Sequence, residues 1–163
     1  MIRAATPADL PRIVEIYNAS IPGRLATADT EPVTVAQRRA WFEGHSERRP
    51  IWVDERDGAV VGWASLSDFY GRPAYGATAE LSVYVAPEAH RRGVARGLVA
   101  HAVERAPSAG VKTLLGFVFG HNAPSLALLD RHRFERWGLL PRVAVLDGVE
   151  RDLVIVGLRL GGA

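Results

Sequence analysis

Residues 78–106 hold a strand pattern that is followed, after a single proline, by a helix pattern. Polar and apolar side chains alternate from Thr78 to Val85, as they do in a strand with one buried face. The apolar side consists of Ala79, Leu81, Val83 and Val85, and the other side of Glu80, Ser82 and Tyr84. Pro87 ends the strand, and a helix is predicted from about Arg91 to Ala106. This part of the chain therefore predicts a fold that packs helices against a sheet.

The rest of the chain repeats this mixture of strands and helices. Strands are predicted at 2–5, 51–53, 60–66, 114–119, 143–146 and 153–158, and helices at about 7–19, 35–45 and 124–132. Asp57-Gly58 and Asp147-Gly148 are typical of hairpin turns, and residues 21–32 are predicted to form a loop. The order predicts an α/β (α+β) domain with a central mixed, mostly antiparallel sheet flanked by helices, rather than a doubly wound one.

Composition excludes several classes of protein. The 163 residues suffice for one domain, which we expect to span 1–163. Cysteine is absent, which excludes a disulfide scaffold and a thiolate nucleophile. No apolar run predicts a membrane span or a signal peptide, so we expect a cytoplasmic domain with no membrane partner. A net charge of +2 does not indicate a nucleic-acid partner, and the five histidines have no metal-ligand spacing, so no metal is expected.

The turn from His90 to Gly97 is a candidate anion site, because it joins a strand end to a helix start. The first amide groups of a helix have no intrahelical acceptor, and the helix dipole is positive there. Gly93 and Ala95 allow an anion to approach the backbone closely. Positive charge is added by Arg91, Arg92 and Arg96. Taken alone, these residues fit an arginine-rich helix start on the solvated surface equally well.

Two common phosphate loops are absent. Neither G-x-x-x-x-G-K-[ST] nor G-x-G-x-x-G occurs in the chain. Nucleoside triphosphate and nicotinamide chemistry are therefore not expected.

The same turn and two further segments carry a resemblance to a known family. Val83-Tyr84-Val85-Ala86-Pro87 and His90-Arg91-Arg92-Gly93-Val94-Ala95 resemble motif A of the GNAT superfamily of N-acetyltransferases, in which [QR]-x-x-G-x-[GA] opens a helix after a strand. Asn122-Ala123-Pro124-Ser125 and Phe134 resemble its motif B. Arg72-Pro73-Ala74-Tyr75 with Thr78-Ala79-Glu80 resembles the phosphinothricin (amino-acid-like) N-acetyltransferase branch. The resemblance covers nearly the whole chain.

The resemblance implies that the chain binds acetyl-CoA. Its pantetheine arm would pair, like an added strand, with the backbone of Val83, Tyr84 and Val85, and an N–H near Val83 would polarise the thioester carbonyl. Its pyrophosphate would lie on the amide groups of Arg91, Arg92, Gly93, Val94, Ala95 and Arg96. Asn122 matches the family's contact to the cofactor arm.

Glu80 matches the catalytic glutamate of the branch. A carboxylate on an apolar strand has a pKa raised by desolvation, and it can take the proton that an amine loses before it attacks. The alternative is a glutamate on the solvated face of the strand. Arg72 and Tyr75 match positions that line the acceptor site, where they would hold an acidic group and supply a hydroxyl and a ring face. The alternative for this pair is a polar surface loop.

Five positions depart from the family pattern. His90 stands where the motif usually has glutamine or arginine, and Arg133 replaces the glycine usual before Phe134. Leu129 stands where relatives have a tyrosine or histidine that protonates the leaving thiolate. A thiolate leaves tolerably near neutral pH without a fixed acid, so this change removes one role and not the activity. Glu150 replaces a usual tryptophan, and Ala28 replaces an aromatic residue often found over the acceptor.

The predicted reaction is direct transfer, within a ternary complex, of the acetyl group of acetyl-CoA to the primary amine of a small amino-acid-like acceptor. The acceptor would be of the phosphinothricin or methionine sulfoximine type. One alternative is acetylation of a peptide or protein N-terminus, and another is a non-catalytic acyl-CoA-binding module, which Leu129 would suit. Relatives in this branch are often homodimers, so a second copy of the chain is an expected partner.

Overall fold

The computed structural model describes residues 1–161, so residues 162 and 163 of the predicted domain lie outside the described residues. The strands are β1 (Ile2–Ala4), β2 (Ile51–Arg56), β3 (Ala59–Asp68), β4 (Thr78–Val85), β5 (Thr113–Phe119), β6 (Glu135–Leu146) and β7 (Val149–Arg159). The helices are α1 (Leu10–Ser20), α2 (Val35–Glu43), α3 (Val94–Arg105) and α4 (Ala123–Arg131). Short 3₁₀ turns are η1 (Pro7–Asp9), η2 (Pro73–Tyr75), η3 (Pro87–Ala89) and η4 (Ala106–Ala109).

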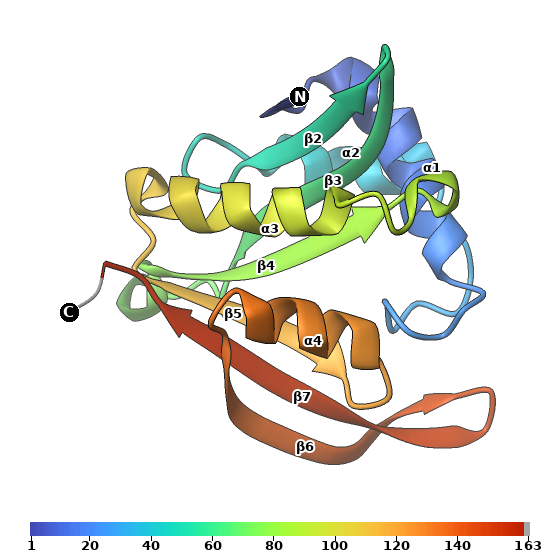
Figure 1. Ribbon diagram of the computed structural model, residues 1–163, viewed down its shortest axis with the longest axis vertical. Helices are drawn as coiled ribbons and strands as arrows, with labels where there is room; N and C mark the ends of the chain where they lie inside the picture. The colour runs from blue at the N-terminus through green and yellow to red at the C-terminus, as the bar shows by residue number, and fades with distance from the viewer. Residues whose placement is uncertain (162–163) are drawn as a thin grey trace.

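The strands form one seven-stranded sheet in the order β1-β2-β3-β4-β5-β7-β6. Every neighbouring pair is antiparallel except β4 and β5, which are parallel. Helices α3 and α4 cover one face, and α1 and α2 cover the other (Figure 1). The predicted mixed, mostly antiparallel sheet flanked by helices is therefore confirmed.

The parallel pair forms a fork. β4 and β5 pair only where Thr78–Glu80 lies beside Thr113–Leu115, and the two strands then diverge. β4 stays paired with β3 as far as Val85, and β5 stays paired with β7 as far as Phe119. Figure 1 shows the two strands separating, with α3 beside one arm and α4 beside the other. The fork thus leaves one edge of each arm without a strand partner inside the sheet.

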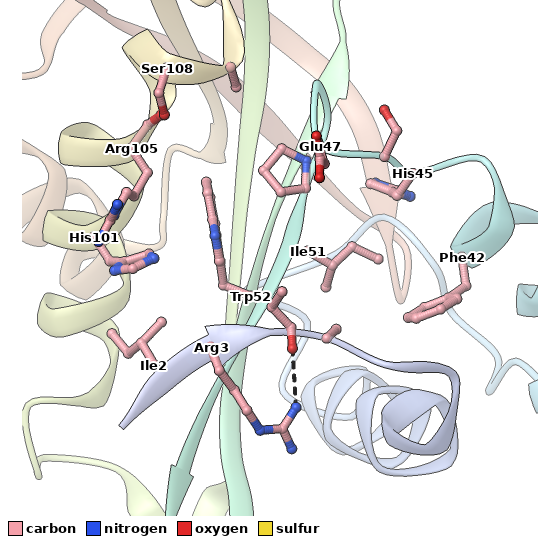
Figure 2. Close-up of a pocket in the computed structure, with 15 residues that line it drawn as sticks. Ile2, Arg3, Phe42, His45, Glu47, Ile51, Trp52, His101, Arg105 and Ser108 are labelled. Carbon is pink, nitrogen blue, oxygen red and sulfur yellow. Dashed lines mark hydrogen bonds between the residues drawn. The ribbon is translucent and has the colours of Figure 1, made fainter.

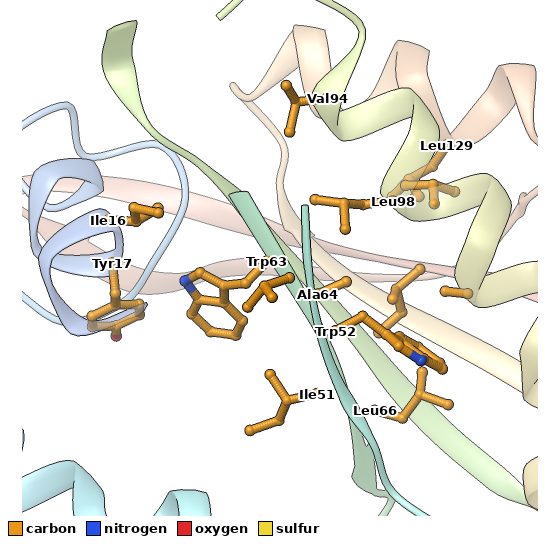
Figure 3. Close-up of a cluster of buried hydrophobic side chains, with 14 of the residues drawn as sticks. Ile16, Tyr17, Ile51, Trp52, Trp63, Ala64, Leu66, Val94, Leu98 and Leu129 are labelled. Carbon is orange, nitrogen blue, oxygen red and sulfur yellow. The ribbon is translucent and has the colours of Figure 1, made fainter. Parts of the chain in front are cut away.

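Apolar side chains fill both sides of the sheet (Figure 3). On the α1–α2 face, the buried Trp63 indole donates a hydrogen bond from Nε1 to the Ile13 carbonyl at 3.1 Å. On the α3–α4 face, Val94 and Leu98 are buried against the sheet. Because Val94 opens α3, this packing also determines where that helix begins relative to the fork.

The boundaries of several predicted elements were wrong: the strand predicted at 153–158 begins at Val149, and the strand predicted at 51–53 continues to Arg56. Two further errors have a cause in the backbone. The helix predicted from Arg91 begins at Val94, because Arg91 and Gly93 have φ values of 63° and 76°, which belong to the left-handed region and not to a helix. The strand predicted at 143–146 begins at Glu135, and its register shifts twice before Ala144. These irregularities weaken the alternation by which a strand is recognised.

Gly62 is expected to tolerate no side chain, because α3 packs directly on it. A Cβ atom there would lie 2.7 Å from Val94 Cγ1 and 3.1 Å from both Leu98 Cδ1 and the Tyr84 carbonyl oxygen. Gly62→Ala should therefore lower the free energy of unfolding by about 1–3 kcal/mol, measured by urea denaturation.

Gly97→Ala is the matched control, since its Cβ would have only Ile2 Cδ1 nearby, at 3.9 Å. Alanine is favoured over glycine within a helix, so this variant should be as stable as the parent chain or more stable by about 0.5–1 kcal/mol. Equal stability of the two variants would contradict the close packing at Gly62.

Candidate functional site

The fork exposes backbone hydrogen-bonding groups on both arms. The Ala86 N–H donates to the Val61 carbonyl at 2.8 Å, which places the even-numbered residues at this end of β4 toward β3. The backbone groups of Val83 and Val85 therefore face the fork, whereas those of Tyr84 face β3. The Val85 carbonyl already accepts a hydrogen bond from His90 Nε2 at 3.1 Å. Val83 is therefore the residue of this edge whose N–H and carbonyl are best placed to pair with an added chain. An extended chain could pair with this edge in the manner of a strand.

The turn before α3 offers a row of free amide groups. Within residues 1–161, the amide groups of residues 92–96 donate to no protein acceptor, and the first donor of the helix is Gly97, whose N–H bonds to the Gly93 carbonyl at 3.0 Å. A Cβ on Gly93 would have no atom within 4 Å, so the turn is open on that side. Arg91, Arg92 and Arg96 are exposed around it. This combination of free donors, helix dipole and positive charge suits a diphosphate.

Three consecutive carbonyl groups of the loop 21–32 accept hydrogen bonds from the two arms of the fork. Tyr84 Oη on β4 donates to the Ala26 carbonyl at 3.3 Å. Beyond the end of β5, His121 Nε2 donates to the Arg24 carbonyl at 2.8 Å and Asn122 Nδ2 to the Leu25 carbonyl at 3.1 Å. The loop thus bridges both arms. Asn122 also caps α4, because its Oδ1 accepts from the Ser125 N–H at 3.3 Å, so its side chain orders the loop and the helix together.

A second set of contacts joins this loop to α1 and α2. Tyr17 Oη lies 2.6 Å from the Thr27 hydroxyl oxygen and donates a hydrogen bond to Asp29. Arg38 Nη2 lies 3.4 Å from Asp29 Oδ2, and its guanidinium lies 4.5 Å from the centre of the Tyr17 ring. The Tyr17 ring in turn meets the Tyr84 ring edge-on at 5.1 Å. The predicted loop is confirmed, and these contacts hold it against the α1–α2 face.

Glu80 lies at the closed end of the fork. It is the last residue of β4 that pairs with β5, opposite Leu115, and it pairs with Ser67 of β3 on its other side. By the alternation of strand side chains, its carboxylate is on the same face as the Tyr84 ring. Burial raises the pKa of the Glu80 carboxyl above its ordinary value. A carboxylate with a raised pKa beside a strand fork is a candidate general base.

Arg72 and Tyr75 lie in the loop 69–77, which joins β3 to β4. Arg72 is exposed and precedes the turn η2, and the Tyr75 ring meets the Phe69 ring edge-on at 5.4 Å. Phe69 stacks at 6.4 Å on Phe117, which belongs to the β5 arm of the fork and shares the face of Glu80 by strand alternation. The structure therefore connects the predicted acceptor residue Tyr75 to the fork through aromatic contacts.

A groove of about 540 Å³ lies away from the fork, at the β1 edge of the sheet (Figure 2). It runs between α2 and the end of α3, over the side chains of Trp52 and His101. None of the site residues predicted from the sequence lines it. Among residues 1–161 there is no group of three or more side chains placed to hold a metal ion, and no helix long and apolar enough to cross a membrane.

Sequence reasoning missed the residues that tie the site together. Phe69, Phe117 and His121 were assigned no role in binding or catalysis, and the loop carbonyl groups that receive Tyr84, His121 and Asn122 carry no side-chain signal. Most of these contacts join segments far apart in the chain, for example 97 positions between Leu25 and Asn122. Local spacing therefore could not reveal them.

Comparison with known proteins shows that the chain is similar to acetyltransferases. Residues 10–134 match the acetyltransferase (GNAT) family. A Bacillus subtilis protein provisionally named a phosphinothricin acetyltransferase is 46% identical over 160 residues, covering 98% of both chains. An L-methionine sulfoximine/L-methionine sulfone acetyltransferase of Pseudomonas aeruginosa is 34% identical over 161 residues, covering 98% of this chain and 94% of its own.

Solved structures show the same similarity. A phosphinothricin acetyltransferase of the GNAT superfamily from Sinorhizobium meliloti, crystallised with acetyl-CoA, superposes with a TM-score of 0.91 at 31% identity over 99% of this chain and 88% of its own. A ribosomal-protein-alanine N-acetyltransferase from Brucella melitensis superposes with a TM-score of 0.93 at 36% identity, covering 98% of this chain and 99% of its own.

Proposed function

The chain belongs to the acetyltransferase (GNAT) family, and from this membership and the fork we propose that residues 1–163 form one acetyl-CoA-dependent N-acetyltransferase domain. The observation that carries the proposal is the unpaired edge of β4 beside the free amide groups of residues 92–96. Together they fit a ligand that has an extended amide-bearing arm and a diphosphate. When bound, acetyl-CoA supplies an acetyl group activated as a thioester.

The residues present fit this co-substrate at three places. The backbone groups of Val83 and the Val85 N–H would pair with the arm, and the Val83 N–H would donate to the thioester carbonyl oxygen as negative charge develops there. The amide groups of Arg92, Gly93, Val94, Ala95 and Arg96 would bind the diphosphate, with Arg91 adding charge. Tyr84 and Asn122 would act mainly through the loop 21–32, which their side chains hold.

Glu80 would prepare the acceptor. An acceptor amine arrives mostly as an ammonium ion near neutral pH and must lose a proton before its lone pair can attack a carbonyl carbon. The Glu80 carboxylate takes that proton, because desolvation raises its pKa toward that of the amine. Leu129 is buried against the sheet and supplies no proton, so the departing thiolate is protonated by solvent.

The proposed acceptor is a small amino-acid-like primary amine, of the kind named in the phosphinothricin and methionine sulfoximine relatives. The aromatic contacts of Phe69, Tyr75 and Phe117 suit an apolar or sulfur-containing side chain, and the exposed Arg72 suits a carboxylate or phosphinate. A peptide or protein N-terminus is a second candidate, which is favoured by the similarity to the ribosomal-protein-alanine enzyme.

An acceptor panel tests these candidates. Release of free CoA from acetyl-CoA is followed with amino acids, methionine sulfoximine, phosphinothricin and short peptides. We expect turnover with the free amino-acid-like amines and little with peptides. Turnover with peptides alone would move the assignment to the second candidate. Tight CoA binding without turnover on any amine would identify a non-catalytic acyl-CoA-binding module instead.

The chain is also proposed to form a homodimer through β6. This edge strand exposes apolar side chains along its length, and the β6–β7 hairpin presents Leu139, Leu140, Val143, Val145 and Val149. An exposed apolar edge strand is a template for pairing with a second copy. Sedimentation equilibrium should give twice the monomer mass, and Val145→Lys should give the monomer. A monomeric parent chain at micromolar concentration would contradict this assembly.

A cytoplasmic location is proposed from the co-substrate. A CoA thioester carries several phosphate charges and cannot cross a bilayer unaided, so the enzyme must work where acetyl-CoA is made. Detection of the chain in the soluble cytoplasmic fraction of the producing cell tests this point.

A further inference from the structure

We propose that Arg49 is a positioning residue for the acceptor, because its buried guanidinium clamps both ends of the loop that carries Arg72 and Tyr75. This loop, residues 69–77, is called the acceptor loop below. The inference rests on the proposed function, since it concerns the same site.

Arg49 contacts the residue before the acceptor loop, Asp68, and a residue near the end of the loop, Gly76. Its Nε lies 2.6 Å from Asp68 Oδ1 at the end of β3, and its Nη2 donates to the Gly76 carbonyl at 2.8 Å, just before β4. Its Nη1 donates to the Arg48 carbonyl at 2.8 Å. Only 6% of Arg49 is exposed, so this charge has little contact with water and depends on these partners. The guanidinium therefore contacts both Asp68, as an ion pair without a hydrogen bond from Nε, and Gly76, through a hydrogen bond from Nη2. The single ammonium group of lysine cannot reproduce both contacts.

The clamp is itself held rigidly. Ser46 and Arg49 exchange backbone hydrogen bonds of 3.1 and 3.0 Å, and the neighbouring Pro50 carbonyl accepts from the Leu66 N–H of β3 at 3.0 Å. Inside the acceptor loop, by contrast, the Tyr75 and Gly76 amides bond only within the turn, to the Arg72 and Pro73 carbonyls. The hydrogen bonds to the rest of the protein are made near the end of the loop. The Gly76 carbonyl accepts from Arg48 and Arg49, and the Ala77 carbonyl accepts from the Lys112 and Thr113 amides at 2.8 and 3.2 Å. Only the Arg49 guanidinium also contacts Asp68, at the start of the loop.

This arrangement predicts which kinetic constant depends on Arg49. Moving the ends of the acceptor loop moves Arg72 and Tyr75, whereas the turn before α3 and the fork edge of β4 belong to other elements. Small displacements of binding groups cost large factors in rate, so loss of the clamp should weaken use of the acceptor. Use of acetyl-CoA should not change.

Two variants test the clamp, and a third is the control. Arg49→Lys keeps the charge and removes the planar set of guanidinium donors. Asp68→Asn removes the ion pair at a side chain that is 54% exposed. Arg48→Ala is the matched control, because exposed Arg48 donates to the same Gly76 carbonyl, at 2.9 Å, but does not pair with Asp68. Its loss therefore leaves the link between Asp68 and Gly76 through Arg49 in place. Both clamp variants should raise the KM for the acceptor about tenfold or more, with the KM for acetyl-CoA unchanged. The control should leave both constants unchanged.

Hydrogen exchange gives a readout that does not need turnover. The amide groups of residues 69–77 should exchange faster in Arg49→Lys and Asp68→Asn than in the parent chain or in Arg48→Ala. Unchanged exchange in the clamp variants, or equal increases in both KM values, would overturn the role of Arg49. A parent chain that acetylates no amine would overturn the proposed function instead, and the exchange experiment would still decide the clamp.

Discussion

Glu80→Gln is expected to lower kcat by about 10²–10⁴-fold at neutral pH, because the amide has nearly the same shape as the carboxylate but cannot accept a proton. The KM for acetyl-CoA should be unchanged, since the proposed cofactor contacts lie further along β4 and in the turn before α3. Steady-state CoA release measures both constants. In the parent chain the rate should rise with pH as Glu80 ionises, and this dependence on Glu80 should be absent from the variant.

The stability of Glu80→Gln shows whether its loss of activity comes from the missing base or from a damaged fold. Because burial raises the pKa of Glu80 in the folded state, the stability that this group contributes is present below its ordinary pKa of 4.5 and is lost as the pH rises through the raised value. Glu80→Gln should therefore be at least as stable as the parent chain at pH 7–8. Their urea midpoints should converge in acid. A variant that keeps near-parental kcat would show that Glu80 is not the base.

Gly93→Val is expected to weaken CoA binding at least tenfold, an effect of about 1.4 kcal/mol or more. Gly93 has φ of +76°, a conformation that a β-branched residue adopts only with strain of about 1–3 kcal/mol. Relief of that strain would reorient the peptide groups next to Gly93, whose amides belong to the free donors of residues 92–96. Isothermal titration with CoA measures the loss.

Gly58→Val is the matched control for this strain. Gly58 has φ of +78° in the β2–β3 turn and, like Gly93, would have no atom within 4 Å of a Cβ. Both variants should lose a similar amount of stability in urea, but only Gly93→Val should lose affinity for CoA. Equal CoA affinity in the two variants would contradict a diphosphate site at the start of α3.

Much of the fold followed from local patterns. The alternation in β4, the apolar stripe of α3 and the turns at Asp57-Gly58 and Asp147-Gly148 act over a few residues, and the structure has each element in its predicted place. The predictions were wrong where the local sequence gives no signal or an irregular one. Arginine at position 91 gives no sign of its left-handed φ, and the shifts of register in β6 hide a strand of 12 residues.

The candidate site was predictable in its chemistry but not in its geometry. The types and spacing of residues from His90 to Gly97 imply free amides and positive charge, because a helix start always leaves its first donors unpaired. Nothing local shows that β4 and β5 part after Glu80, or that Arg49 lies against both Asp68 and Gly76.

By itself, the sequence determined the kinds of element, their order and the groups that bear the chemistry, since these depend on side-chain type and on periods of two to four residues. Only the tertiary structure decided which strand edges stay open and how far the Glu80 carboxyl is desolvated. It also decided which carbonyl groups hold the loop 21–32. The reason is that burial and strand pairing are properties of segments brought together from distant parts of the chain, and no segment carries them alone.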